Sequence, residues 1–286
     1  MNLTQEFSKV KKASRALGLV SEEKKNKVLR GLAAALLKRG AEILAANQID
    51  CEKMGEADPS YDRLLLTEDR LSAMAKDLEN VANLSAGLGD VLEQRTMPNG
   101  LELKKIRVPL GVIGVIFEAR PNVVVDVFSI CFKAGNACIL KAGSDAQNSA
   151  VVLVKIIREV LREQGLDEDL VFLMPPEREG VAELLKAREF VDVIIPRGGK
   201  GLIDFVVENS TVPVIETGAG IVHTYVDSEV DLEKAAAIIF NAKTRRPSVC
   251  NALDTLLVHK NRLEDLEGLV AKLAEKQVEI FADEAA

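Results

Sequence analysis

The stretch Val112-Ile-Gly-Val-Ile-Phe117, followed by the polar segment Glu118-Ala-Arg-Pro-Asn122, decides the fold of this 286-residue chain. Six consecutive apolar residues that end in a polar loop are typical of a strand buried on both faces of a sheet. Beyond this strand, short apolar runs alternate with segments of helical periodicity. This alternation predicts an α/β fold, with a mainly parallel sheet that is covered by helices on both faces.

Further elements follow from the period of the apolar residues and from turn signals on both sides of that strand. The first hundred residues are expected to be helical, and 101–108 to form a half-exposed strand. Buried strands are expected at 137–140, 170–174, 191–195 and 212–215, and helices at 124–133, 146–163, 180–186 and 201–207. The loops that follow the buried strands should meet at the carboxyl edge of the sheet, where ligands of α/β proteins bind.

Composition excludes several classes of function. Lys and Arg number 37 and Asp and Glu 44, so the formal net charge of -7 argues against a broad nucleic-acid-binding surface. Four scattered cysteines and two distant histidines show no metal-ligand spacing, and no metal site is expected. The N-terminal segment lacks the apolar centre of a secretory signal, and no apolar run approaches the ~18 residues of a membrane span. We therefore expect a cytoplasmic protein with reduced thiols.

Two of the expected loops carry side chains suited to a ligand. The amide of Asn122 can donate to an oxyanion, or the residue can cap the helix that follows, and the sequence leaves both roles open. Lys141 and Ser144 follow the strand expected at 137–140, and a cation beside a hydroxyl suits a phosphate or a ribose. The alternative for Lys141 is an ordinary exposed lysine in a strand-to-helix turn.

A third loop, Arg197-Gly198-Gly199-Lys200, lies between an expected strand and an expected helix. Its glycines let the backbone approach a ligand closely, and its two cations lie at the anion-binding N-terminus of the helix. The segment matches neither the G-x-G-x-x-G dinucleotide fingerprint nor the G-x-x-x-x-G-K-[ST] phosphate loop. Anion binding is still favoured here over a plain turn.

Cys250 differs from the other cysteines in its surroundings. Lys243, Arg245 and Arg246 precede it, and nearby cations favour the thiolate, which is the reactive form. No histidine neighbours it in sequence, so a catalytic and a structural role both remain open. Glu216 ends the strand expected at 212–215, where it is either a buried general base or a strand-end acid bonded to turn amides.

Three segments together resemble one family: RVPLGVIGVIFEARPNV (107–123), IIPRGGKGLI (194–203) and NAKTRRPSVCN (241–251). They closely resemble the gamma-glutamyl phosphate reductases of the aldehyde dehydrogenase superfamily, in the right order over nearly the whole chain. The resemblance implies an aldehyde-dehydrogenase-like fold, a Rossmann-type parallel sheet with an N-terminal helical arm and an incomplete second α/β catalytic domain. It implies an NADP-binding domain at 1–241 and the start of the cysteine domain at 242–286.

The resemblance also implies an activity, the NADPH-dependent reduction of L-glutamate 5-phosphate to L-glutamate 5-semialdehyde in proline biosynthesis. Cys250 then matches the nucleophile that forms a thioester, and Asn122 matches the oxyanion amide. Lys141, with Ser144 beside it, falls at the contact with the adenosine ribose or its 2′-phosphate, and 197–201 falls at the pyrophosphate loop.

The remaining expected roles concern the substrate and the partners. Arg245 and Arg246 are expected to hold the acyl phosphate or the substrate carboxylates, because a guanidinium fork matches both groups. Glu216 aligns with a base that activates water in hydrolytic relatives; phosphate exchange does not need that water, so we place Glu216 among the substrate-binding residues. A homo-oligomer and an association with glutamate 5-kinase are further expectations.

The chain differs from members of the family at its C-terminal end. Members of the family continue past the position that matches Ala286. We therefore expect a fragment or a shortened relative, and the alternative function for it is nucleotide binding without catalysis.

Overall fold

A computed structural model describes residues 2–55, 58, 61–118, 120–177, 179–218, 220–247 and 249–285. The chain divides into two compact units, Met1–Thr217 and Gly218–Ala286, which we call unit 1 and unit 2. The domain boundary expected at 241/242 falls inside a helix of unit 2, Leu232–Thr244. The division between the compact units, at 217/218, lies earlier in the chain than this boundary, and the domain assignment from the family resemblance stays a prediction.

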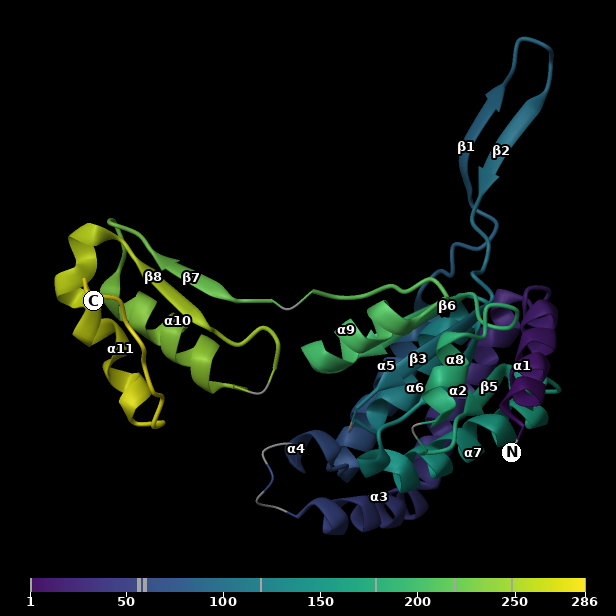
Figure 1. Cartoon of the computed structure of the whole chain (residues 1–286), viewed down its shortest axis with the longest axis horizontal. Coiled ribbons are helices and arrows are strands. Elements are labelled where there is room, and N and C mark those ends of the chain that lie inside the picture. Colours follow the sequence, from purple (N-terminus) through teal and green to yellow (C-terminus); the bar gives the residue numbers. More distant parts are fainter. Residues whose placement is uncertain are drawn as a thin grey trace. The chain divides into compact units, whose positions relative to one another are not determined.

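Unit 1 contains the N-terminal helices and a parallel sheet (Figure 1). Its α-helices are α1 (Leu3–Leu17), α2 (Glu22–Lys38), α3 (Gly40–Met54), α4 (Tyr61–Leu64), α5 (Glu68–Asn83), α6 (Asn122–Lys133), α7 (Gln147–Glu163), α8 (Glu179–Leu185) and α9 (Lys200–Asn209). Its strands are β1 (Val91–Thr96), β2 (Glu102–Ile106), β3 (Val112–Phe117), β4 (Ala137–Lys141), β5 (Val171–Leu173) and β6 (Val193–Arg197). Short 3₁₀ turns, η1 (Ser144–Ala146) and η2 (Glu168–Leu170), precede α7 and β5.

The sheet at the centre of unit 1 has the strand order β5-β4-β3-β6, and all its pairings are parallel. All six residues of β3 are buried, as expected for a central strand, and β3 has the predicted bounds. The chain moves from β3 to β4 and β5 on one side and then returns to β6 on the other. The order therefore reverses between β3 and β6, and the carboxyl ends of these two strands form the topological switch point of the sheet.

Helices cover both faces of this sheet. Helix α6 packs on β3 and β4, helix α7 packs on β5, and both are backed by α2. On the opposite face α1 contacts β3, β4 and β5, and Phe7 of α1 meets Phe172 of β5 edge-on at 6.2 Å between ring centroids. Helix α8 shares that face, because a Cβ atom on Gly180 would lie 3.1 Å from Leu3 of α1. The expected covering of both faces is thus confirmed.

Two expectations for unit 1 differ from the structure. The strand expected at 101–108 forms β2, which pairs antiparallel with β1 in a separate exposed hairpin that the sequence did not predict. The strand expected at 212–215 is wrong, because only a single bridge between Val214 and Ile194 is made there. The apolar run 212–215 therefore contacts the edge strand β6 but does not form a further strand of the sheet.

A carboxylate fixes the amino end of β3. Asp192 Oδ2 accepts a hydrogen bond from Val112 N at 2.7 Å and contacts Lys11 Nζ of α1 at 2.6 Å. Gly111 precedes the strand with a φ of 122°, and a Cβ atom there would lie 2.2 Å from Asp192 Oδ2. Only glycine leaves room for this carboxylate, so the pair sets where β3 begins.

A second buried carboxylate joins α3 to the beginning of α7. Asp50 is 1% exposed. Its Oδ1 accepts from Asn148 N at 3.1 Å and Asn148 Nδ2 at 2.7 Å, and its Oδ2 accepts from Ser149 N at 2.8 Å and Ser149 Oγ at 2.7 Å. The first turn of a helix has N–H groups without partners inside the helix and a positive dipole end, and Asp50 satisfies both.

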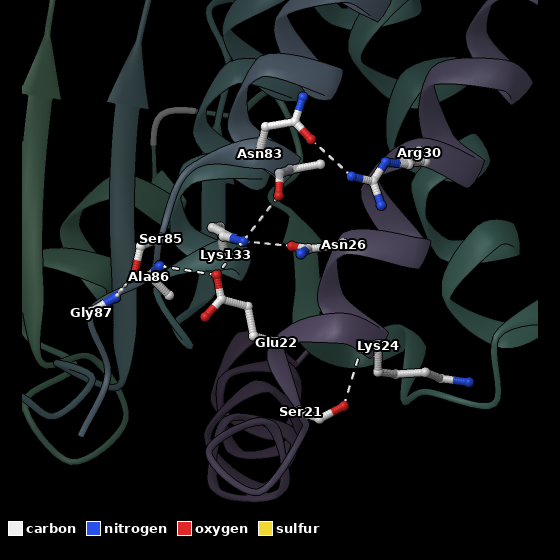
Figure 2. A network of polar contacts seen from close by, with 11 residues as sticks. Ser21, Glu22, Lys24, Asn26, Arg30, Asn83, Ser85, Ala86, Gly87 and Lys133 are labelled. Atoms are coloured by element: carbon white, nitrogen blue, oxygen red, sulfur yellow. Dashed lines mark hydrogen bonds and ion pairs between the residues drawn. The ribbon is translucent and has the colours of Figure 1, made fainter. Parts of the chain in front are cut away.

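A buried cation connects α2, α5 and α6 (Figure 2). Lys133 is 4% exposed, and its Nζ donates to Glu22 Oε1 at 2.8 Å, Asn26 Oδ1 at 2.5 Å and the carbonyl oxygen of Ala82 at 3.2 Å. Glu22 Oε1 also accepts from Ala86 N at 3.2 Å. The hydrogen bonds to Lys133 and Ala86 lower the pKa of Glu22, in that order of size. Three acceptors use the full donor capacity of the ammonium group, which makes its burial tolerable.

Unit 2 is a βαβ element with its own small apolar core. It consists of β7 (His223–Val226), α10 (Leu232–Thr244), β8 (Thr255–Val258), the 3₁₀ turn η3 (Lys260–Asp265) and α11 (Leu266–Ala274). Strands β7 and β8 pair in parallel, and α10 connects them. The core includes Val226, Ile239, Leu253 and Leu269. Asp231 begins α10 by accepting a hydrogen bond from Lys234 N at 3.1 Å.

Replacing Asp50 tests how far unit 1 depends on its buried carboxylate. We expect Asp50→Ala to lower the free energy of unfolding by about 2–4 kcal/mol, because buried donors of α7 lose their acceptor. Chemical denaturation measures the difference. Glu52→Ala, on the exposed face of the same helix, is the control and should leave the stability unchanged. Equal stability of Asp50→Ala and the wild type would contradict this role.

Candidate functional site

Three loops meet at the carboxyl edge of the sheet in unit 1. The register pairs Phe117 of β3 with Arg197 of β6, and Ile116 of β3 with Lys141 of β4. The backbone N of Glu118 also donates to the carbonyl oxygen of Arg197 at 3.3 Å. The predicted meeting of the loops after β3, β4 and β6 is confirmed, and the sequence-predicted residues of these loops lie along one edge.

Asn122 is the first residue of α6, directly after Pro121. The alternative of a helix cap does not hold, because Asn122 lies inside the helix and its side chain serves another contact. Asn122 Nδ2 donates to Asp126 Oδ2 at 2.8 Å, one helical turn further on. An amide nitrogen carries two protons, so one N–H bond stays available to a ligand at this edge.

Asp126 is a partly buried carboxyl group in a region of mixed charge. Its burial raises the pKa of Asp126 above the ordinary value, and the negative charge of Asp77 raises it further. The hydrogen bond from Asn122 and the positive charge of Arg197 act in the opposite direction. Asp126 therefore links the amide on α6 electrostatically to the loop that follows β6.

The glycine-rich loop after β6 is in contact with Glu118, which follows β3. Glu118 Oε1 accepts from Gly199 N at 3.2 Å. A Cβ atom on Gly198 would lie 2.7 Å from Cδ of Glu118, so this contact requires the missing side chain. Arg197, Gly198, Gly199 and Lys200 are all exposed, and Lys200 begins α9. The loop thus offers cations and backbone N–H groups, and a carboxylate already uses one of these N–H groups.

Lys141 is buried, with 6% of its surface exposed, so the alternative of an ordinary exposed lysine is wrong. Its Nζ donates to the carbonyl oxygens of Ala142 at 3.0 Å and Pro176 at 3.1 Å. These contacts fix the ammonium group between the loops that follow β4 and β5. Ser144 is exposed at the start of η1, and its Oγ donates to Asp145 Oδ1 at 3.2 Å.

Glu216 does not lie where the sequence placed it. It is exposed in the segment 215–218, which has no regular structure, and not at the end of a buried strand. The expectation of a buried general base is therefore wrong. An exposed carboxylate can bind a cationic ligand, but water remains in contact with it.

The four cysteines fall into two groups. Cys51, Cys131 and Cys138 are buried, and Cys250 is exposed. Burial raises the pKa of Cys131 to about 12 and that of Cys138 well above the ordinary value, and it also raises the pKa of Cys51. A thiol that stays protonated is not a nucleophile, so only Cys250 is placed for covalent chemistry.

Cys250 lies in unit 2, in the connection from α10 to β8. Turns closed by hydrogen bonds from Val249 N to Arg246 O, at 3.3 Å, and from Ala252 N to Val249 O, at 3.1 Å, hold this connection. Lys243 Nζ donates to the carbonyl oxygen of Leu253 at 3.0 Å. One of the three predicted cations thus holds the loop.

The other two cations, Arg245 and Arg246, line a cavity that is also bordered by the sequence neighbours of Cys250. Arg245 and Arg246 are exposed and border a cavity of about 410 Å³, together with Asn241, Val249 and Asn251. Two guanidinium groups and two amides offer many donors, and guanidinium donors match the oxygens of phosphates and carboxylates. A small anionic group is the ligand that suits this cavity.

Unit 1 and unit 2 therefore offer different chemistry. The sheet edge of unit 1 presents an amide, a buried ammonium group and a glycine loop, whereas unit 2 presents an exposed thiol and an arginine-lined cavity within one connecting segment. Within the described ranges, no group of three or more His, Cys, Asp or Glu side chains is placed to hold a metal ion. No described helix is both long and apolar enough to span a membrane.

Sequence reasoning missed two acids at this edge, Glu118 and Asp126. Glu118 directly follows the buried strand that decides the fold, which is a position where ligand-binding residues are expected. Asp126 lies four residues after Asn122, and that spacing places two side chains on one face of a helix. Both signals are visible in the sequence, but only the contacts distinguish these acids from other charged residues.

Comparison with known proteins bears on both units. The model of the aldehyde dehydrogenase family matches residues 2–284. A gamma-glutamyl phosphate reductase of Chlorobaculum parvum is 56% identical over 284 residues, which are 99% of this chain and 68% of that protein. One of Bacteroides fragilis is 52% identical over 286 residues, with 100% of this chain and 69% of that protein covered.

A solved structure agrees with these sequences. The crystal structure of a gamma-glutamyl phosphate reductase from Thermotoga maritima superposes with a TM-score of 0.89 at 41% identity. The match covers 98% of this chain and 69% of that one. The chain thus spans about two thirds of the length of these relatives.

Alkylation measures the difference between the cysteines. We expect iodoacetamide at neutral pH to modify Cys250 in the native protein and to leave Cys51, Cys131 and Cys138 unmodified, because their thiols are buried and protonated. Peptide mass spectrometry locates the adducts. The same treatment in denaturant should give four adducts. Modification of Cys131 before Cys250 in the native protein would contradict the assignment.

The raised pKa of Asp126 makes stability depend on pH. In the window between its unfolded and its native pKa, the native protein binds more protons than the unfolded chain, so stability decreases as the pH rises. The variant Asp126→Asn has no such titration. We expect the stability of the wild type relative to this variant to fall as the pH rises above about 4. A relative stability that increases with pH would contradict the raised pKa.

Proposed function

Because the chain belongs to the aldehyde dehydrogenase family, and within it to the gamma-glutamyl phosphate reductases, we propose that it reduces L-glutamate 5-phosphate to L-glutamate 5-semialdehyde in proline biosynthesis. The observation that supports this most directly is the exposure of Cys250, while the other cysteines are buried, in a segment whose sequence neighbours Val249 and Asn251 line a cavity together with Arg245 and Arg246. A nucleophilic thiol and an anion-binding cavity are the two elements that an acyl phosphate requires.

In the proposed reaction the thiolate of Cys250 attacks the acyl carbon of the substrate. The bond from that carbon to the phosphate oxygen breaks, phosphate leaves, and a thioester remains on Cys250. The thioester carbon would accept the hydride that a nicotinamide cofactor supplies when it is bound. The resulting thiohemiacetal then expels the thiolate, which releases the semialdehyde and restores Cys250.

The other residues of the site bind and orient. Arg245 and Arg246 hold the phosphate or carboxylate oxygens of the substrate, because guanidinium groups pair with both. Glu216 is an exposed carboxylate suited to the substrate ammonium group. The free N–H of Asn122 donates to the oxyanion that forms when the carbonyl is attacked, a contribution of about 10²–10³ in rate in acyl-transfer enzymes.

Nicotinamide cofactors belong to the chemistry of this family, and the sheet edge of unit 1 fits one. Its donors are Lys141, Ser144 and the loop Arg197-Gly198-Gly199-Lys200, at the switch point where dinucleotides bind in doubly wound sheets. The glycines leave the loop backbone open to a pyrophosphate, which would displace Glu118 from Gly199 N. We propose NADPH over NADH on the basis of the family resemblance, in which Lys141 falls at the contact with the adenosine ribose or its 2′-phosphate.

Three further proposals concern the surroundings of the enzyme. A homo-oligomer is supported by the exposed hairpin of β1 and β2, on which apolar residues such as Leu92 and Ile106 are half exposed. Such exposed apolar strands are typical of surfaces that pair with another chain. Association with a glutamate 5-kinase follows from the instability of acyl phosphates in water. A cytoplasmic location agrees with the free cysteines.

Turnover tests the proposed function in the reverse direction. We expect phosphate-dependent reduction of NADP⁺ in the presence of glutamate semialdehyde, and we expect Cys250→Ser to lower its kcat at least about 10³-fold. Cys131→Ala, at a buried thiol, is the matched control and should retain activity. Saturable NADPH binding without turnover, unaffected by Cys250→Ser, would instead support nucleotide binding without catalysis.

A further inference from the structure

An amide group is an ambiguous hydrogen-bonding partner. Its oxygen accepts and its nitrogen donates, and a rotation of 180° about the side chain exchanges the two. Asn122 contributes to the proposed reaction only when its nitrogen faces the oxyanion, because its oxygen would repel the developing charge. Something in the structure must therefore determine which way this amide points.

Asp126 supplies that constraint. Its Oδ2 accepts from Asn122 Nδ2 at 2.8 Å, and an ionised carboxylate can only accept. The nitrogen of Asn122 therefore faces Asp126, and its second proton points away from this bond. Both residues belong to α6, four positions apart, so the helix backbone fixes the distance between them. The contact is partly buried, which limits competition from water.

Charges on neighbouring elements act on the same carboxylate. Arg197, at the end of β6, favours its ionised form, whereas Asp77 on α5 disfavours it. Arg197 has the smaller of these two effects, and the hydrogen bond from Asn122 favours the ionised carboxylate more strongly than Arg197 does. The amide of Asn122 and the carboxylate of Asp126 therefore stabilise each other, because the partly buried carboxylate needs this donor.

We propose that Asp126 is a positioning residue that holds the side-chain amide of Asn122 with its nitrogen towards the oxyanion of the reaction. The inference rests on the proposed function, and it assigns Asp126 no contact with substrate or cofactor. Its effect on the rate passes entirely through Asn122.

A double-mutant cycle tests whether Asp126 acts on the rate through Asn122. We expect Asp126→Leu to lower kcat about 10-fold or more with KM within about 2-fold, because only transition-state stabilisation is lost. Asp126→Asn keeps an oxygen acceptor and should show a smaller loss. In the background of Asn122→Ala, Asp126→Leu should cause no further loss, because the group on which it acts is absent.

The control is Asp77→Asn, which removes the same charge from a neighbouring helix and does not touch the amide. It should retain the kcat of the wild type. Thermal unfolding of every variant separates positioning from loss of structure. An unchanged kcat in Asp126→Leu, or the same loss with and without Asn122, would overturn the proposal.

A second measurement does not depend on turnover. The side-chain amide protons of Asn122 can be identified by NMR as the pair that disappears in Asn122→Ala. We expect their chemical shifts and exchange rates to change in Asp126→Leu and to stay unchanged in Asp77→Asn. A wild-type chain without turnover would contradict the proposed function, and unchanged Asn122 resonances in Asp126→Leu would separately overturn the role of Asp126.

Discussion

The parallel pairing of β3 with β4 on one side and β6 on the other is the constraint on which unit 1 depends. It aligns Ile116 with Lys141 and Phe117 with Arg197, so three loops from distant parts of the sequence end at the same edge. Asp192 holds the amino end of β3 through Val112 N. A slip of the register would displace that contact and the whole carboxyl edge together.

Two buried charges in unit 1 connect its helices. Asp50 and Lys133 are each surrounded by enough hydrogen-bond partners to replace the water that they lost. Asp50 accepts from the backbone and side chains of Asn148 and Ser149, and Lys133 donates to Glu22, Asn26 and Ala82. These groups connect α3 to α7, and α2 to α5 and α6, and they make the packing of the helices specific where apolar contacts alone would tolerate sliding.

At the site, the contacts distinguish residues that are held by the protein from residues that are exposed to solvent. Lys141 is fixed by two carbonyl oxygens, whereas Arg245 and Arg246 remain exposed beside a hollow. Lys141 thus represents a first group, a cation that the protein holds in place for the proposed cofactor, and the exposed arginines represent a second group that can adjust to a ligand. Cys250 belongs to the second group, and the division agrees with the proposed reaction, in which the thiol and the arginines contact the substrate.

The sequence by itself determined the buried strand β3, the alternation of strands and helices, and the family. Periodicity and turn residues are local features, so they predict single elements. The three segments that resemble the family predict the overall fold and the activity. The sequence could not predict the burial of Lys141, the exposure of Glu216 or the hairpin partner β1. The first two depend on how far each strand extends against its neighbours, and the third depends on a pairing whose exposed residues show no apolar alternation. Tertiary structure alone brought Glu118 to Gly199 and Arg197 towards Asp126, because contacts between separate loops are set by the register of the sheet and not by neighbours along the chain.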